Sequence, residues 1–142
     1  NLARLFDALP LPDPFEPRPD IYPKYEAVVV RNEAGLRRLE CMAWSIVRTV
    51  PGKNPETGRP ANWWFTIEGE EGCAFAGIGR FSEGARRFAF LTCEPNPLVA
   101  PLHPKAMPVI LRREDYDAWL DGEAADACAL AQPFPSQLMR VA

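Results

Sequence analysis

Proline is the residue that most limits how this chain can fold. The chain contains 16 prolines in 142 residues, about double the usual ~5%, and six of them lie between Pro10 and Pro23. Proline fixes φ and has no backbone N–H to donate, so this segment cannot be a helix or a central strand. Residues 1–24 are therefore predicted to form an extended, polyproline-like belt on the surface, which begins with one helical turn at residues 1–7.

Beyond the belt, short runs of β-branched and aromatic residues alternate with turn-forming residues, which is typical of an antiparallel β protein. Two helices and a tail that packs back on the sheet are predicted near the end, over 113–120, 123–132 and 133–139. The predicted fold class is α+β and β-rich: an antiparallel barrel-like sheet with short peripheral and C-terminal helices, in a single domain over residues 1–142. Strands are predicted at residues 26–31, 39–47, 63–67, 73–78, 87–93 and 107–111.

Composition and charge narrow the classes of partner. No apolar run approaches the ~20 residues of a membrane helix, and the start lacks the layout of a signal peptide, so we expect a cytoplasmic protein with no membrane partner. The formal net charge of −3 argues against a surface that grips nucleic acid everywhere. Basic residues are concentrated in residues 37–59, whereas residues 114–126 carry six acids and no base. A local basic groove with an acidic back would give this pattern, and so would ordinary solvated faces.

The four cysteines do not indicate a metal site or a disulfide framework. They are far apart, form no CxxC pair and have one histidine to help them, so no metal and no cofactor is predicted. We interpret them as reduced thiols. Three of them lie in apolar, strand-like runs, where a free cysteine is expected to be a small buried hydrophobe rather than a nucleophile: Cys41, Cys73 and Cys93.

The only histidine of the chain, His103, lies in a proline-rich loop between two apolar runs. Prolines at 95, 97, 101, 104 and 108 stiffen this loop, which predicts that the imidazole is held in a fixed place. Imidazole exchanges a proton readily near neutral pH, so His103 is a candidate site residue. A hydrogen-bonded loop histidine without a chemical role is the alternative interpretation.

Several segments around this loop are similar to those of one known family. Similarity extends back through Phe75-Ala-Gly-Ile and forward to Pro133-Phe-Pro-Ser-Gln-Leu, and a weaker similarity is found before residue 74, at Ala43-Trp-Ser-Ile-Val. Together these segments resemble the SOS-response-associated peptidase family, whose domain is called SRAP. The strongest matches are Thr92-x-Glu94-x-Asn96, Leu98-Val-Ala-Pro-x-His103, Lys105-Ala-Met-Pro-Val-Ile-Leu and Asp117-Ala-Trp-Leu.

The resemblance implies a β-rich protein that binds single-stranded DNA and crosslinks covalently to abasic sites. In the family, an N-terminal cysteine exposed by methionine removal reacts, and Asn1-Leu2 resembles the residues directly after the family's Met-Cys start. An α-amine with a pKa near ~7.7–8 can form an imine with the aldehyde of a ring-opened abasic sugar, and the adjacent thiol then closes a thiazolidine. The resemblance gives His103 the proton transfers, and gives Thr92 and Asn96 a place in lining the pocket or shaping the loop.

The expected partner is single-stranded DNA with abasic sites, bound by a monomer. Adjacent strand residues point to opposite faces, so at most one of Trp63 and Trp64 can stack outward on a base. Trp64 is assigned to stacking. Four basic residues are assigned to phosphates: Arg48, Lys53, Arg59 and Lys105.

Two other functions remain open from the sequence. The family's Asn-x-Arg-x-Glu segment has no counterpart between Trp44 and Trp63, and Gly79 stands where the family usually has Trp. These departures motivate a degenerate or truncated member that binds DNA or a protein without catalysis. The family's name suggests a self-cleaving peptidase, although no serine or cysteine is paired with His103 in a recognisable motif.

Overall fold

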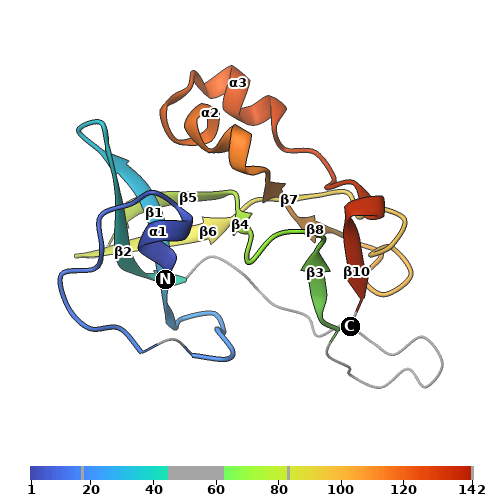
Figure 1. Cartoon of the computed structure of the whole chain (residues 1–142), viewed down its shortest axis with the longest axis horizontal. Helices are drawn as coiled ribbons and strands as arrows, with labels where there is room; N and C mark the ends of the chain where they lie inside the picture. Colours follow the sequence, from blue (N-terminus) through green and yellow to red (C-terminus); the bar gives the residue numbers. More distant parts are fainter. Residues whose placement is uncertain (17, 45–62, 83, 142) are drawn as a thin grey trace. The chain divides into compact units, whose positions relative to one another are not determined.

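The computed structural model describes residues 1–16, 18–44, 63–82 and 84–141 (Figure 1). The chain divides into two compact units. Unit 1 comprises residues 1–48 and 77–89, and unit 2 comprises residues 49–76 and 90–142. Whether the whole chain folds as a single domain stays a prediction. Among the described residues, no helix is both long enough and apolar enough to cross a membrane.

Unit 1 begins with the predicted helical turn and the proline-rich belt. Helix α1 (Leu2–Leu5) is capped by Asn1, whose side-chain oxygen accepts a hydrogen bond from the Ala3 N–H at 3.0 Å. Residues 10–23, apart from residue 17, form neither helix nor strand, as predicted. Leu9 ties the start of the belt to the sheet, because its N–H donates to the Arg37 carbonyl and its carbonyl accepts from the Leu39 N–H, both at 2.9 Å.

The sheet of unit 1 has four strands in the order β1-β2-β6-β5. The β1–β2 hairpin is antiparallel and turns at Ala34 and Gly35, which both have positive φ, as tight hairpin turns require. Strand β6 runs parallel to β2, with Ala43 opposite Arg87, so this pair departs from the antiparallel pattern. The strands are β1 (Glu26–Glu33), β2 (Leu36–Trp44), β5 (Gly77–Ser82) and β6 (Ala85–Phe90).

Among its described residues, unit 2 contains three two-stranded sheets. Strand β3 (Phe65–Ile67) pairs with β10 (Met139–Val141), so the C-terminal tail does pack back on a strand, as predicted. The other pairs are also antiparallel: β4 (Ala74–Phe75) with β9 (Ile110–Leu111), and β7 (Thr92–Cys93) with β8 (Met107–Pro108).

Three predicted strands are each divided at a single residue: Ala76, Leu91 and Val109. These residues form a closed ring of backbone hydrogen bonds. The Ala76 N–H donates to the Val109 carbonyl at 2.8 Å, the Val109 N–H donates to the Leu91 carbonyl at 3.0 Å, and the Leu91 N–H donates to the Ala76 carbonyl at 2.9 Å. Each segment therefore changes its strand partner at this point without leaving a backbone group unpaired. Ala76 and Val109 are completely buried.

Short helices and two clusters of buried side chains are also found in the described part of unit 2. The helices are η1 (Arg113–Asp115), α2 (Tyr116–Asp121), α3 (Ala124–Ala129) and η2 (Ser136–Leu138). Tyr116 and Trp119 of α2 pack against the cluster of Ala76, Val109 and Leu111. The second cluster consists of Val99, Met107, Phe134 and Met139, and lies beneath the loop that carries the histidine.

Candidate functional site

The histidine loop, residues 94–106, is closed at its base by a pair of short strands. Thr92 of β7 lies opposite Pro108 of β8, and Cys93 lies opposite Met107. Pro108 has no N–H to donate, and the next residue, Val109, donates to the Leu91 carbonyl before the chain continues into β9 with another partner. The two ends of the loop are therefore fixed by backbone pairing before any side chain contributes.

Asn96 organises the interior of the histidine loop. It is 4% exposed and is the one buried polar side chain in the part of the chain that the structure describes. Its Oδ1 accepts hydrogen bonds from the backbone N–H groups of Leu98 at 3.1 Å and Val99 at 3.0 Å, which is an Asx turn. Its Nδ2 donates to the Phe134 carbonyl at 2.6 Å and contacts Met139 Sδ at 3.2 Å. One carboxamide thus joins the loop to the C-terminal segment.

The turn that Asn96 starts leads directly to His103. The Val99 carbonyl accepts the His103 N–H at 2.8 Å, and the His103 Nδ1 lies 2.7 Å from the Ala106 carbonyl oxygen. A carbonyl oxygen only accepts, so Nδ1 carries the hydrogen in this bond. In the neutral ring the lone pair is then on Nε2, for which no hydrogen bond to a described residue is found. The half-buried imidazole is thus held in the described structure through Nδ1.

The other predicted site residues lie in several parts of the chain. Thr92 is exposed at the base of the histidine loop, and Lys105 is exposed near the C-terminal end of that loop. Trp64 is 59% exposed, just before β3, while its neighbour Trp63 is half-buried. The predicted phosphate contacts Arg48, Lys53 and Arg59 lie outside the described residues.

Three of the four cysteine thiols, those of Cys41, Cys73 and Cys93, are not activated as nucleophiles. Cys41 and Cys93 are half-buried, and the prediction of burial is wrong for Cys73, which is exposed. Desolvation raises the pKa of all three thiols, and nearby carboxylates add to the effect at Cys41 and Cys93. A thiol with a raised pKa is mostly protonated at neutral pH and is a poor nucleophile. No described serine or cysteine is hydrogen-bonded to the His103 ring.

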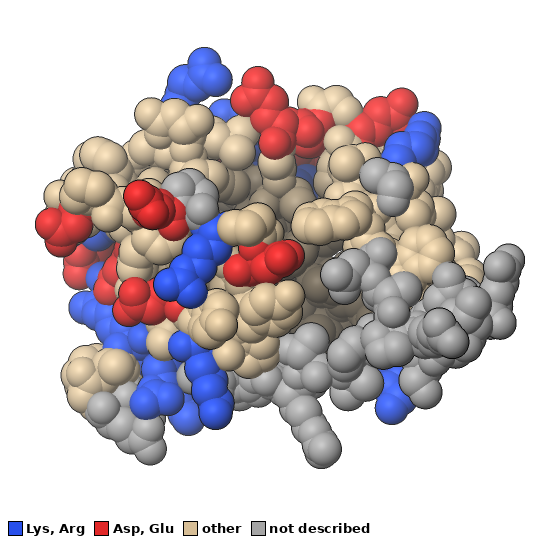
Figure 2. All heavy atoms as spheres, turned by 90° about the horizontal axis from the view of Figure 1, so that it is seen from below, with Lys and Arg blue, Asp and Glu red and all other residues tan. Residues whose placement is uncertain are grey.

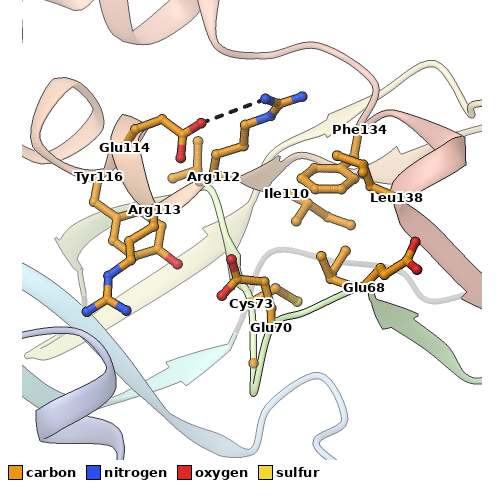
Figure 3. A pocket seen from close by; sticks show the side chains of 13 residues that line it. Glu68, Glu70, Cys73, Ile110, Arg112, Arg113, Glu114, Tyr116, Phe134 and Leu138 are labelled. Carbon is orange, nitrogen blue, oxygen red and sulfur yellow. Dashed lines mark ion pairs between the residues drawn. The ribbon is translucent and has the colours of Figure 1, made fainter.

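A small cavity that the sequence did not indicate lies elsewhere in unit 2 (Figure 3). Its volume is about 160 Å³, and it contains neither His103 nor Asn96. Charges of both signs line it, and the Arg112 Nη1 to Glu114 Oε1 distance is 3.7 Å. Phe134 and Leu138 form an apolar wall on the other side. The charged lining residues come from two separate segments, residues 68–70 and 112–114, and no motif in the sequence indicates that these segments meet.

The charge pattern of the described surface is mixed. On the face seen in Figure 2, acidic and basic side chains both appear, so this face is not uniformly basic. The exposed pair of Arg140 Nη2 and Glu68 Oε2, 2.8 Å apart, is one example of this mixing. Among the described residues, no group of three or more His, Cys, Asp or Glu side chains is arranged to hold a metal ion.

The fold and the histidine loop define a class of protein: a β-rich scaffold that presents one imidazole from a rigid, proline-stiffened loop. The model of the family described as SOS response associated peptidase (SRAP) matches residues 51–142. The chain belongs to this family, and the family associates it with the response to DNA damage. No curated protein matches the chain.

Several solved structures are similar to the chain, and two crystal structures are among them. A crystal structure of a protein from Bordetella bronchiseptica has a TM-score of 0.77 and 18% identity, over 99% of this chain and 92% of that chain. A crystal structure of a protein from Bacteroides thetaiotaomicron has a TM-score of 0.50 and 17% identity, over 82% of this chain and 44% of that chain. These likenesses show the fold, and they confirm the predicted β-rich class.

Proposed function

We propose that the protein binds single-stranded DNA and forms a covalent crosslink with abasic sites in it. The observation that carries the proposal is the histidine loop, which leaves Nε2 of the only imidazole with its lone pair available. Membership of the SRAP family supports the same conclusion. The proposed nucleophile is the amine and thiol of a cysteine that directly precedes Asn1.

The chemistry needs proton transfer at each step. The amine adds to the aldehyde of the ring-opened sugar, and loss of one water gives an imine; the thiol then adds to the imine carbon and closes a thiazolidine. A base must take a proton during ring opening, and an acid must protonate the departing hydroxyl. We assign both steps to Nε2 of His103. The raised pKa values of Cys41, Cys73 and Cys93 support a nucleophile other than these thiols.

The test is an intact-mass measurement on protein that carries a leading cysteine before Asn1. With a single-stranded oligonucleotide containing an abasic site, we expect one adduct whose mass is the sum of the two reactants minus one water. The same oligonucleotide with an intact base should give none, and neither should protein with serine in place of the leading cysteine. Absence of any adduct from the protein with its leading cysteine would reject the proposed function.

Substitution of the histidine tests its role in the same assay. His103→Gln should slow adduct formation by on the order of 10²-fold, since positioned acid–base groups contribute 10²–10⁴. Lys105→Gln, an exposed neighbour in the same loop, is assigned to phosphate contact; it should weaken DNA binding and leave the rate at saturating DNA unchanged. An unchanged rate in the His103→Gln protein would exclude the assignment of proton transfer to this ring.

Binding without catalysis is the second candidate. It is favoured by the raised pKa values of Cys41, Cys73 and Cys93, which leave none of these three thiols activated. In that case the protein would bind single-stranded DNA with no change in mass, and affinity would fall steeply with salt.

A further inference from the structure

One buried side chain, Asn96, joins the C-terminal segment to the histidine loop. We propose that Asn96 is a positioning residue, which fixes both the orientation and the tautomer of His103 and makes this depend on the segment around Phe134. The part of this inference that concerns reaction rate rests on the proposed function. The part that concerns the imidazole does not.

The polar atoms of the Asn96 side chain all have hydrogen-bond partners inside the protein. Oδ1 accepts hydrogen bonds from two loop N–H groups, and Nδ2 donates one to the Phe134 carbonyl. The backbone N–H of Asn96 also donates to Met107 Sδ at 3.3 Å. A buried amide with every position occupied has one orientation, because rotating it would leave several polar groups unpaired.

Hydrogen bonds connect Asn96 to the ring through the turn. Asn96 holds the Val99 N–H through both its side-chain oxygen and, at 3.1 Å, its backbone carbonyl. The Val99 carbonyl in turn holds the His103 N–H at 2.8 Å. These bonds set the backbone of residues 96–103, and this places Nδ1 against the Ala106 carbonyl. Loosening the turn would release that contact and let the ring exchange its tautomer.

Asn96 is also linked to the C-terminal segment. Phe134 is 6% exposed and Met139 is 3% exposed, so the partners of Nδ2 are themselves fixed by the core. Their cluster also contains Val99, the residue through which the turn reaches His103. The segment after α3 therefore helps to hold the histidine loop in place, although we assign it no group that takes part in the proposed crosslinking reaction.

The experiment uses the fact that His103 is the only histidine. Its two ring nitrogens give a single pattern in a long-range proton–nitrogen NMR spectrum of uniformly ¹⁵N-labelled protein, recorded at a pH where the ring is neutral. We expect the wild-type protein to carry hydrogen on Nδ1 and none on Nε2. Asn96→Ala should convert this to a mixture of tautomers. Asn96→Asp should lie between the two, because it keeps the acceptor for Leu98 and Val99 and loses the donor to Phe134.

The matched control is Glu94→Gln, an exposed polar change two residues away in the same loop, which should leave the nitrogen pattern as in wild type. In the adduct assay, Asn96→Asp should lower the rate at saturating DNA by on the order of 10-fold to 100-fold, with the affinity for intact single-stranded DNA unchanged. A wild-type ring protonated on Nε2 would overturn the inference, and so would a wild-type pattern in Asn96→Asp. If the wild-type protein forms no adduct, the proposed function fails while the NMR result still decides the role of Asn96.

Discussion

Replacing Asn96 with alanine should destabilise the protein far more than removing an ordinary asparagine cap. The substitution leaves the Leu98 N–H and the Phe134 carbonyl without the partners that Asn96 provides. The Val99 N–H loses one of its two acceptors and keeps the Asn96 backbone carbonyl at 3.1 Å. Each polar group left unsatisfied inside a protein costs about 1–3 kcal/mol. Two such groups give an expected loss in free energy of unfolding of roughly 2–6 kcal/mol, about 4 kcal/mol at the centre of that range.

The matched control is Asn1→Ala, the same chemical change at an exposed helix cap. Asn1 makes a single hydrogen bond, to the Ala3 N–H, and the groups that it would leave behind can bond to water. Loss of such a cap costs about 0.5–2 kcal/mol. The comparison thus separates a buried network from a surface cap with the same side chain.

The assay is urea denaturation followed by tryptophan fluorescence and circular dichroism. For an m value of about 1.5–2 kcal/mol/M, the Asn96→Ala midpoint should fall by roughly 2 M, and the Asn1→Ala midpoint by roughly 0.5 M. A domain of ordinary stability, about 5–15 kcal/mol, keeps Asn96→Ala folded in water. Equal shifts for the two variants would refute the reasoning that Asn96 satisfies buried groups.

Local geometry gives three further predictions. A Cβ on Gly122 would lie 2.3 Å from the Ala118 carbonyl oxygen, so Gly122→Ala should cost roughly 3 kcal/mol, whereas Gly69→Ala, with open space but a φ of +79°, should cost about 1 kcal/mol; urea midpoints measure both. Val109→Ala should lower the free energy of unfolding by about 1–2 kcal/mol, because the completely buried side chain leaves a cavity when its methyl groups are removed. An effect near zero would contradict the packing. Burial raises the folded-state pKa of Cys93, so folding disfavours its thiolate. Alkylation of Cys93 should therefore begin at a higher pH in the folded protein than in the unfolded chain. The contribution of Cys93 to stability should be present below about pH 8.5 and decline above it. Alkylation of the folded protein at the rate of the unfolded chain would contradict this.

Much of the fold could be predicted because its signals are local. Proline excludes regular structure from residues 10–23, whatever the rest of the chain does. Asn32-Glu-Ala-Gly35 predicts a turn, and the hairpin turns there because Gly35 adopts a positive φ. The tail after Pro133 pairs with β3 as β10, as its apolar residues suggested.

The candidate site was only partly predictable. The proline-rich segment and the single histidine indicate a rigid loop with one imidazole, and the structure gives that loop two fixed ends and an internal turn. The partner of His103 Nδ1 is a backbone carbonyl, so no residue type marks it. The partner of Asn96 Nδ2 lies 38 residues away and is also a carbonyl, which leaves no trace in the spacing of side chains.

The sequence by itself determined where regular structure is forbidden, which runs are strands and which residue can exchange a proton, since these depend on the chemistry of neighbouring residues along the chain. Only the tertiary structure decided that the strands divide at Ala76, Leu91 and Val109, and that a buried amide connects the histidine loop to the C-terminal segment. The physical reason is that backbone groups are the same in every residue. Their pairing is set by how distant segments meet when apolar side chains are buried, and it fixes which ring nitrogen of His103 carries the hydrogen.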